Sequence, residues 1–217
     1  MATILMTLAE TKAPNKYEWS INLLTLGRRG RIYDYLKQKY LQESQLLLDA
    51  GCGTGRFMEV ADTSWITSIG IDVSEGMLQE AQKRFIGKKH DHSLIQASIT
   101  SLPVKSEVFD VVICNLVLSE LNYQQVQDSI NEFIFCLKKG GLLLIVTESV
   151  PKSKFKRSII NIARVPAFMI ASLISKTPKH PIHDIMTPLS RWGSIIDQKT
   201  YLGGYLTLFA IKKNDNK

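Results

Sequence analysis

The sequence predicts an α/β domain whose mostly parallel sheet is doubly wound, with helices on both faces. Between about residues 46 and 148, short apolar runs alternate with longer amphipathic stretches, which is typical of parallel strands joined by helices. The first of these runs passes directly into three closely spaced glycines. At 217 residues, with 45% hydrophobic and 22% charged content, the chain can bury a large core without disulfides. We therefore expect one domain over residues 1–217.

The first apolar run, residues 46–48, is followed by Asp49 and then by Gly51, Gly53 and Gly55. A parallel strand delivers its chain to a ligand at its carboxyl end in this way. Glycine suits such a loop because a side chain would block close backbone approach and because a tight turn can require positive φ. The spacing is G-x-G-x-G, whereas dinucleotide-binding turns follow G-x-G-x-x-G.

This loop resembles motif I of class I S-adenosylmethionine-dependent methyltransferases, which implies a seven-stranded Rossmann-like sheet and S-adenosylmethionine as cofactor. A pyrophosphate favours bare amides at a helix N-terminus, whereas this cofactor carries a sulfonium and an ammonium that call for a carboxylate. Asp49 could bind the amino acid end of the cofactor directly or through water, with the glycine amides facing its methionine moiety and ribose. An ordinary nicotinamide-binding turn is the alternative.

An acidic residue also ends the second expected strand, residues 66–72, and an amphipathic helical segment follows up to residue 85. The resemblance implies that Asp72 binds the ribose hydroxyls and that Val73 and Met77 flank the adenine. Taken alone, Asp72 could instead be a helix N-terminal acid stabilised by the helix dipole.

The third and fourth strands are expected over residues 94–99 and 109–115, with a Leu-Pro turn between them. The family most often places Asp where this chain has Ser98, so the adenine contact would come from the Ser98 hydroxyl or the Ile99 amide. Asn115 ends the fourth strand, where the family places a residue that faces the methionine portion of the cofactor. A helix ending in Lys138, Lys139 and glycine should precede the fifth strand.

The chain should close with a hairpin of residues 194–202 and 205–211 around Gly203 and Gly204, its last strand antiparallel in the sheet. Residues 212–217 are expected to form a frayed polar tail. His90 and His92 are expected in a surface turn and do not indicate a metal site. The three cysteines form no C-x-x-C pair, which favours a reduced, cytoplasmic protein without a metal.

The methyl acceptor must be recognised by segments outside this core, and the first of them is a helical lid over residues 14–40. Its arginines could bind an anionic group and its aromatic residues could line a pocket. The alternative is a solvated basic face with aromatic residues packed on the sheet. The residues concerned are Arg28, Arg29, Arg31, Tyr17, Trp19, Tyr33 and Tyr35.

The second segment is a substrate-side insertion over residues 150–193. Its apolar stretch, about residues 155–175, is flanked by lysines and broken by Arg164 and Pro166, so it makes a poor membrane span. It could lie on a bilayer surface, which would make the protein peripheral at the membrane, or form a buried lid or a dimer contact. We expect no signal peptide at the N-terminus.

Several features resemble the menaquinone and ubiquinone C-methyltransferases, including residues 70–78, the Leu-Pro turn and the Thr-Glu-Ser-x-Pro stretch at 147–151. The resemblance implies a small-molecule acceptor that is hydrophobic or lipid-like, such as a quinol. Methyl transfer mainly needs alignment, and a general base only where the acceptor loses a proton. Candidates for a base are Glu120, Ser119, His180, His183 and Asp184, although a structural role is the favoured interpretation for each of them.

Two other functions are compatible with part of the sequence. A net charge of +7 and a pI near 9.3 permit an RNA or DNA methyltransferase. Residues 115–118 read Asn-Leu-Val-Leu rather than the N-P-P-Y type motif of exocyclic-amine enzymes, which disfavours nucleic acid. A regulatory or scaffolding protein that binds the cofactor without turnover is the remaining alternative.

Overall fold

The computed structural model describes residues 18, 21–22, 25–43, 45–63, 66–88, 90, 92–149, 189 and 191–215. Its strands are β1 (Gln45–Ala50), β2 (Ile66–Asp72), β3 (His92–Gln96), β4 (Phe109–Asn115), β5 (Leu137–Glu148), β6 (Gly193–Tyr201) and β7 (Leu206–Lys213). Its helices are α3 (Arg29–Tyr40), α4 (Arg56–Ala61), α5 (Glu75–Phe85) and α6 (Tyr123–Cys136), with short 3₁₀ turns η1 (Leu118–Glu120) and η2 (Leu202–Gly204).

The seven strands form one sheet in the order β3-β2-β1-β4-β5-β7-β6. The first five are parallel, and β7 pairs antiparallel with both β5 and β6. The expected fold class and C-terminal hairpin are therefore confirmed. The chain winds outward from β1 to β3 and then crosses to β4, so the strand order reverses between β1 and β4. Ligands bind at such a switch point in open α/β sheets, outside the carboxyl ends of the strands.

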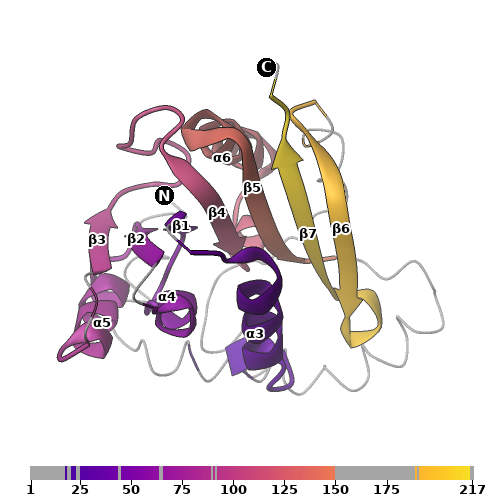
Figure 1. The fold of residues 1–217 in the computed structure, drawn as a ribbon. Coiled ribbons are helices and arrows are strands. Elements are labelled where there is room, and N and C mark those ends of the chain that lie inside the picture. The colour runs from indigo at the N-terminus through magenta and orange to yellow at the C-terminus, as the bar shows by residue number, and fades with distance from the viewer. Residues whose placement is uncertain are drawn as a thin grey trace.

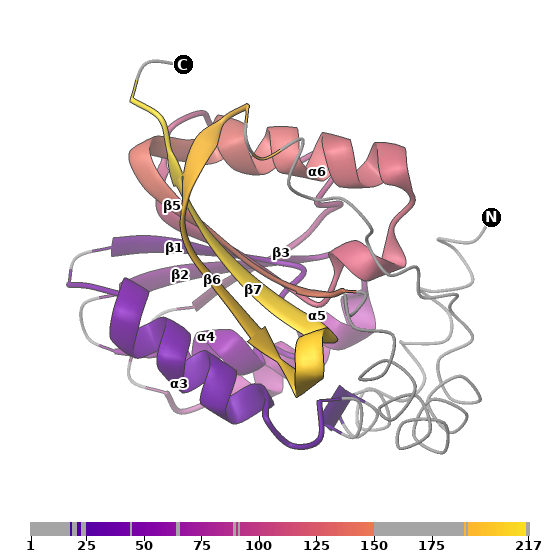
Figure 2. The same cartoon turned by 90° about the vertical axis from the view of Figure 1, so that its right-hand side faces the viewer.

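Helices cover both faces of the sheet (Figures 1 and 2). Helix α6 packs on one face, and α3, α4 and α5 lie on the other. Alternate residues of the central strands supply the two cores: Leu48 and Val112 face the α6 side, whereas Leu47 and Val111 face α3 and α4. Burial on both faces explains why these strands read as continuous apolar runs instead of alternating with polar residues.

Local capping fixes the helix starts near the site. The Ser74 hydroxyl accepts a hydrogen bond from the Met77 amide and so starts α5 directly after β2. Asn122 and Gln125 form a reciprocal capping box at the start of α6. Both arrangements satisfy amides that a helix N-terminus leaves unpaired. As a result, β2 and α5 have the bounds that the sequence pattern predicts.

Three local expectations were wrong. Helix α6 ends at Cys136, so the two lysines and two glycines after it belong to β5 and not to the helix end. Lys213 is the last residue of β7 and is only 6% exposed, because its ammonium donates to the Ile134 and Leu137 carbonyls at the end of α6. His92 opens β3 and stacks on the Phe85 ring at 4.0 Å. The sequence pattern predicts a loop or tail for a polar residue at a strand end when the residue that it contacts lies far away in the sequence.

Candidate functional site

The glycine loop after β1 is held against the ends of β2 and β4. Gly51, Gly53 and Gly55 all have positive φ, at 79°, 53° and 73°. A Cβ on Gly51 would lie 2.4 Å from Val117 Cγ2, and one on Gly55 would lie 2.8 Å from the Phe85 ring. A Cβ on Gly53 would meet nothing within 4 Å of it among the described residues. The outer glycines therefore allow close packing, while the middle one borders open space.

Asp49 lies at the switch point, near the carboxyl end of β1. Its side chain is 2% exposed, and none of the described residues hydrogen-bonds its Oδ2 atom. Burial, reinforced by the Asp72 carboxylate, raises the pKa of Asp49 to about 8. A buried carboxyl oxygen without a partner is costly, so this position is suited to a ligand that carries a positive charge or a hydrogen-bond donor.

Asp72 ends β2 and holds the glycine loop from the neighbouring strand. One carboxylate oxygen accepts from the Gly53 amide at 2.8 Å, and the other accepts from the Ser74 amide at 2.8 Å. Burial raises the pKa of Asp72 in spite of these two bonds. Each oxygen keeps a further acceptor site. Asp72 thus shapes the loop and still has lone pairs for two hydroxyl groups.

The predicted adenine contacts differ in exposure. Val73 is 40% exposed directly after β2, whereas Met77 is only 2% exposed within α5. Ser98 is exposed, and its hydroxyl bonds to the Thr100 hydroxyl at 2.7 Å, while Ile99 is buried beside it. Val73 therefore offers an exposed apolar surface at this end, and the adenine-binding roles of all four residues stay predictions.

Asn115 ends β4 on the other side of the switch point. Its side-chain amide donates to the hydroxyl of Tyr33, which lies buried on α3 and packs edge-on against Phe57. Burial raises the pKa of Tyr33 well above its usual range, so the phenol keeps its proton. Leu116 follows with φ of 61°, a backbone conformation that non-glycine residues rarely adopt. Such backbone outliers cluster at functional sites.

The N-terminal segment reaches the glycine loop through Glu18. Thr54 donates its hydroxyl proton to Glu18, whose other carboxylate oxygen pairs with Arg29. Arg29 is therefore buried against Glu18 and does not present a free cation to an acceptor. Tyr33 is buried in the core as well. Part of the expected lid therefore packs its aromatic residues on the sheet, which is the alternative to a lid that lines an acceptor pocket. The sequence offered no signal for Glu18, which lies 36 residues from Thr54.

The predicted catalytic candidates are only partly within the described residues. Ser119 and Glu120 lie in η1, just beyond β4, and Ser119 is fully buried with no hydrogen-bond partner for its hydroxyl among those residues. His180, His183 and Asp184 fall outside the described part of the chain, as do Tyr17 and Trp19. Where the structure describes the chain, no three His, Cys, Asp or Glu side chains are grouped to hold a metal. The cysteines at 52, 114 and 136 are buried and free.

The polar groups at the carboxyl edge fit S-adenosylmethionine. The unpartnered Asp49 oxygen suits its ammonium group, and the open space beside Gly53 admits a ligand close to the backbone. Asp72 retains acceptor sites for ribose hydroxyls at the end of the adjacent strand. A pyrophosphate would instead bring negative charge towards two buried carboxyl groups, which electrostatics disfavours.

This fold and the polar groups of this site agree with the class I S-adenosylmethionine-dependent methyltransferase domain that the glycine loop resembles. Residues 48–145 of the chain match the family model described as "Methyltransferase domain". The cofactor of the family is S-adenosylmethionine. The matched segment contains the glycine loop, Asp72 and Asn115.

Known relatives match about the same part of the chain. An uncharacterized protein of Methanocaldococcus jannaschii is 35% identical over 126 residues, which cover 58% of this chain and 50% of that protein. A ubiquinone/menaquinone biosynthesis C-methyltransferase of Syntrophotalea carbinolica is 31% identical over 140 residues, covering 63% and 58%. The chain thus spans about half the length of the curated relatives it matches.

A solved structure shares the fold at lower identity. The magnesium protoporphyrin IX methyltransferase of Synechocystis, solved with bound S-adenosylhomocysteine, superposes with a TM-score of 0.64 at 19% identity. The match covers 85% of this chain and 81% of that one. At this identity the likeness extends to the fold alone.

Proposed function

We propose that this chain transfers the methyl group of S-adenosylmethionine to a small-molecule acceptor. The observation that carries the proposal is the Asp49 carboxyl group, buried without a partner for Oδ2 at the switch point of the sheet. A buried carboxyl oxygen without a partner is costly, and a bound ligand with a hydrogen-bond donor would remove that cost.

The cofactor-binding roles are divided among the strand ends. Asp49 and the amides around Gly53 would hold the amino acid end of the cofactor, and Asp72 would accept from the ribose hydroxyls. Val73 would cover one side of the adenine, with Met77, Ser98 and Ile99 nearby. Asn115, fixed by Tyr33, would face the methionine portion. The sulfonium of the bound cofactor supplies an already activated methyl group, so the protein mainly has to align the acceptor with it.

We infer a hydrophobic or lipid-like acceptor, for which a quinol is the leading example. The name of the Syntrophotalea relative, a ubiquinone/menaquinone biosynthesis C-methyltransferase, supports this class, although its identity to this chain is 31%. No helix in the described ranges is long and apolar enough to cross a membrane. The predicted surface segment at residues 155–175 lies outside those ranges, so peripheral membrane binding is part of the proposal.

An acceptor-labelling screen tests the function. Purified protein is incubated with methyl-labelled cofactor and with separate pools of metabolites, lipid extract, RNA and DNA. Label in a metabolite or lipid would support the proposal. Label in RNA or DNA, with binding that weakens steeply with salt, would instead favour the nucleic-acid enzyme that the +7 charge permits.

Cofactor binding is measured separately by calorimetry, so that a missing acceptor is not confused with a missing cofactor site. Cofactor uptake with no labelled pool would favour a non-catalytic binding protein. Asp72→Ala and Gly53→Leu should each weaken binding at least tenfold, since one removes the ribose acceptor and the other fills the open space beside the loop. Unchanged affinity in both variants would refute the site.

Membrane association has its own test. The full chain and a variant lacking residues 152–176 are floated with liposomes made from a bacterial lipid extract. We expect the full chain to float and the deletion variant to float much less. An intact protein that stays at the bottom of the gradient would remove the peripheral part of the proposal without touching the cofactor site.

A further inference from the structure

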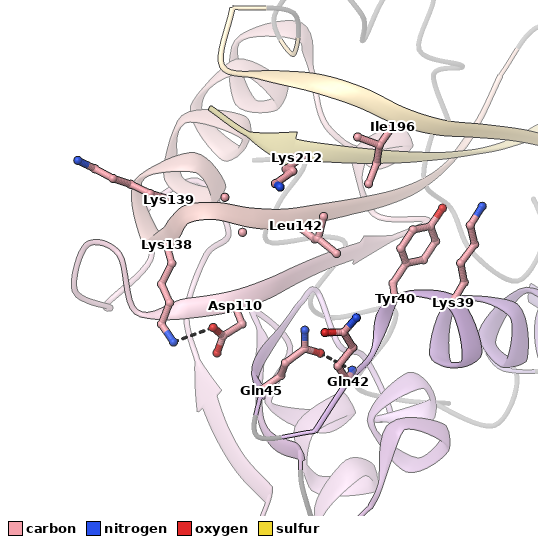
Figure 3. A pocket seen from close by; sticks show the side chains of 12 residues that line it. Lys39, Tyr40, Gln42, Gln45, Asp110, Lys138, Lys139, Leu142, Ile196 and Lys212 are labelled. Atoms are coloured by element: carbon pink, nitrogen blue, oxygen red, sulfur yellow. Dashed lines mark hydrogen bonds and ion pairs between the residues drawn. The ribbon is translucent and has the colours of Figure 1, made fainter. Parts of the chain in front are cut away.

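A second concave site lies at the amino-terminal ends of the parallel strands, on the opposite side of the sheet from the carboxyl ends that form the cofactor site. It is a hollow of about 380 Å³ bordered by the first residues of β1 and β4 and by the early part of β5 (Figure 3). We term it the basic hollow and define it by Lys39, Lys138, Lys139, Lys212, Gln42 and Gln45. Its volume falls within the usual range of small-ligand pockets.

The charges of the basic hollow are unbalanced. Four lysines line it, against one acidic residue, Asp110. Lys138 pairs with Asp110 at 2.7 Å, and Lys39 pairs with Asp197 at 2.7 Å. Within the described part of the chain, Lys139 and Lys212 have no ion pair. Two cations at this edge are therefore left for a ligand or for solvent.

The backbone of β5 explains how these two lysines come to border the same hollow. Pairing between β4 and β5 passes from Phe109–Leu137 directly to Val111–Leu142, so residues 138–141 bulge out of the ladder. Gly140, with φ of 68°, makes the turn within this bulge. Lys212 enters the same place from β7, where it pairs with Leu142. In Figure 3 the Lys212 side chain lies between β5 and β7, while Lys139 extends away at the rim.

Further polar groups surround the positive centre. In Figure 3 the side-chain amides of Gln42, which follows α3, and of Gln45, the first residue of β1, lie beside the hollow. The Gln45 carbonyl oxygen accepts from the Gln42 backbone amide at 2.7 Å, which fixes its side chain and leaves its NH₂ group as a donor. Leu142 and Ile196 add apolar wall. The Asp215 carboxylate lies near Gly140 and is a nearby negative charge.

We propose that the basic hollow binds a phosphate group, carried either by a small free ligand or by an anionic lipid headgroup. Phosphate oxygens are strong acceptors for ammonium and amide donors, and charge-assisted bonds of this kind exceed neutral ones in strength. The hollow lies at the amino-terminal ends of β1, β4 and β5, whereas the cofactor site lies at the carboxyl ends. Binding here is therefore separate from S-adenosylmethionine binding.

A titration followed by NMR tests the proposal. Inorganic phosphate and pyrophosphate are added at constant ionic strength to ¹⁵N-labelled protein without cofactor, and the Gly140 and Gly141 amides are monitored. We expect saturable shifts that the double variant Lys139→Gln/Lys212→Gln weakens about tenfold, as expected for the loss of charge-assisted bonds. Flotation with phosphatidylglycerol or phosphatidylcholine vesicles forms the lipid arm.

The matched control is Lys83→Gln/Lys88→Gln. It removes the same charge at α5, which packs beside β3 and therefore lies across the sheet from β5 and β7. Saturable phosphate shifts lost only in the first double variant would identify a free phosphate ligand. Flotation with phosphatidylglycerol alone, lost only in that variant, would identify a lipid headgroup. The proposal is overturned if neither arm shows binding, or if both double variants lose it equally. Because no cofactor is present, the result is independent of methyl transfer.

Discussion

Two aspartates at opposite edges of the sheet have opposite surroundings. Asp110 is the second residue of β4, at the amino-terminal end of the strand, where its two oxygens accept from Lys138 and from the Leu46 amide at 2.7 and 2.9 Å. Asp49, near the end of β1, is buried with no partner for Oδ2 among the described residues. The bonds from Leu46 and Lys138 hold the pKa of Asp110 below its ordinary value despite partial burial, whereas burial raises that of Asp49 to about 8.

The difference separates structural from functional acids. Asp110 joins the starts of three strands, so its hydrogen bonds are completed by the fold itself. The fold leaves the hydrogen bonding of the Asp49 carboxyl group incomplete, at the position where α/β sheets bind ligands. A sequence displays both simply as an acid beside an apolar run, and only the set of partners distinguishes them.

Asparagine substitutions should give the largest contrast between the two edges. Asp49→Asn removes the carboxyl group that can ionise when the cofactor ammonium binds beside it, so we expect S-adenosylmethionine affinity to fall about 100-fold, or about 3 kcal/mol. Asp110→Asn should leave that affinity unchanged and lower the free energy of unfolding by at most about 1 kcal/mol, because its ion pair is solvent-screened. Calorimetry and urea unfolding measure the two quantities. Equal affinity in the two variants would show that Asp49 does not contact the cofactor.

The pH dependence of stability should also differ in sign. Because the folded-state pKa of Asp49 is raised, this residue favours the folded protein less as pH rises from about 4 towards 8. The lowered pKa of Asp110 contributes stability above pH 4 that is lost only as pH falls through its folded-state value. The difference in unfolding free energy between Asp49→Asn and the parent protein, both without cofactor, should therefore shift by about 2 kcal/mol in favour of the variant between pH 6 and pH 8. Urea unfolding at several pH values measures this, and a constant difference would contradict it.

Within the cofactor edge, the glycines should separate packing from ligand contact. Gly51→Ala brings its Cβ within 2.4 Å of Val117 Cγ2, whereas Gly53→Ala meets no described atom within 4 Å. Both pay the cost of a left-handed backbone, so Gly51→Ala should lose about 1–2 kcal/mol more unfolding free energy than Gly53→Ala. Thermal unfolding tests this. Similar losses in both variants would mean that the Val117 loop moves aside.

The sequence predicted the regions whose structure is local. Strand β2, helix α5 and the acids at the ends of β1 and β2 follow from apolar runs, a capping serine and the spacing of glycines, which are all local patterns. The C-terminal hairpin was expected for the same reason, and the bounds of its strands differ from the expected ones by one or two residues.

Contacts between distant residues were not predictable in this way. Asn115 and Tyr33 are 82 residues apart, and Asp197 accepts from Tyr35 and Tyr40 across 162 and 157 residues. The buried ammonium of Lys213 likewise depends on carbonyls more than 70 residues earlier. A polar residue in a pattern indicates that it needs a partner, but the pattern does not identify which one. These long-range pairs decide whether a polar group is structural or available to a ligand.

Helix α3 runs between the carboxyl and the amino-terminal ends of the parallel strands, so it allows a final test with a smaller expected effect. The Tyr33 hydroxyl accepts from Asn115 at the cofactor edge, whereas the Tyr40 hydroxyl donates to Asp197 at 2.6 Å near the opposite edge. Tyr33→Phe frees the Asn115 amide, so we expect cofactor affinity to fall about threefold, or about 0.7 kcal/mol. Tyr40→Phe removes a hydrogen bond of the same kind from the same helix and should lower only the unfolding free energy, by about 1 kcal/mol. Calorimetry of the two variants side by side decides between a specific link from α3 to the site and a general loosening of the helix, which would weaken cofactor binding equally in both.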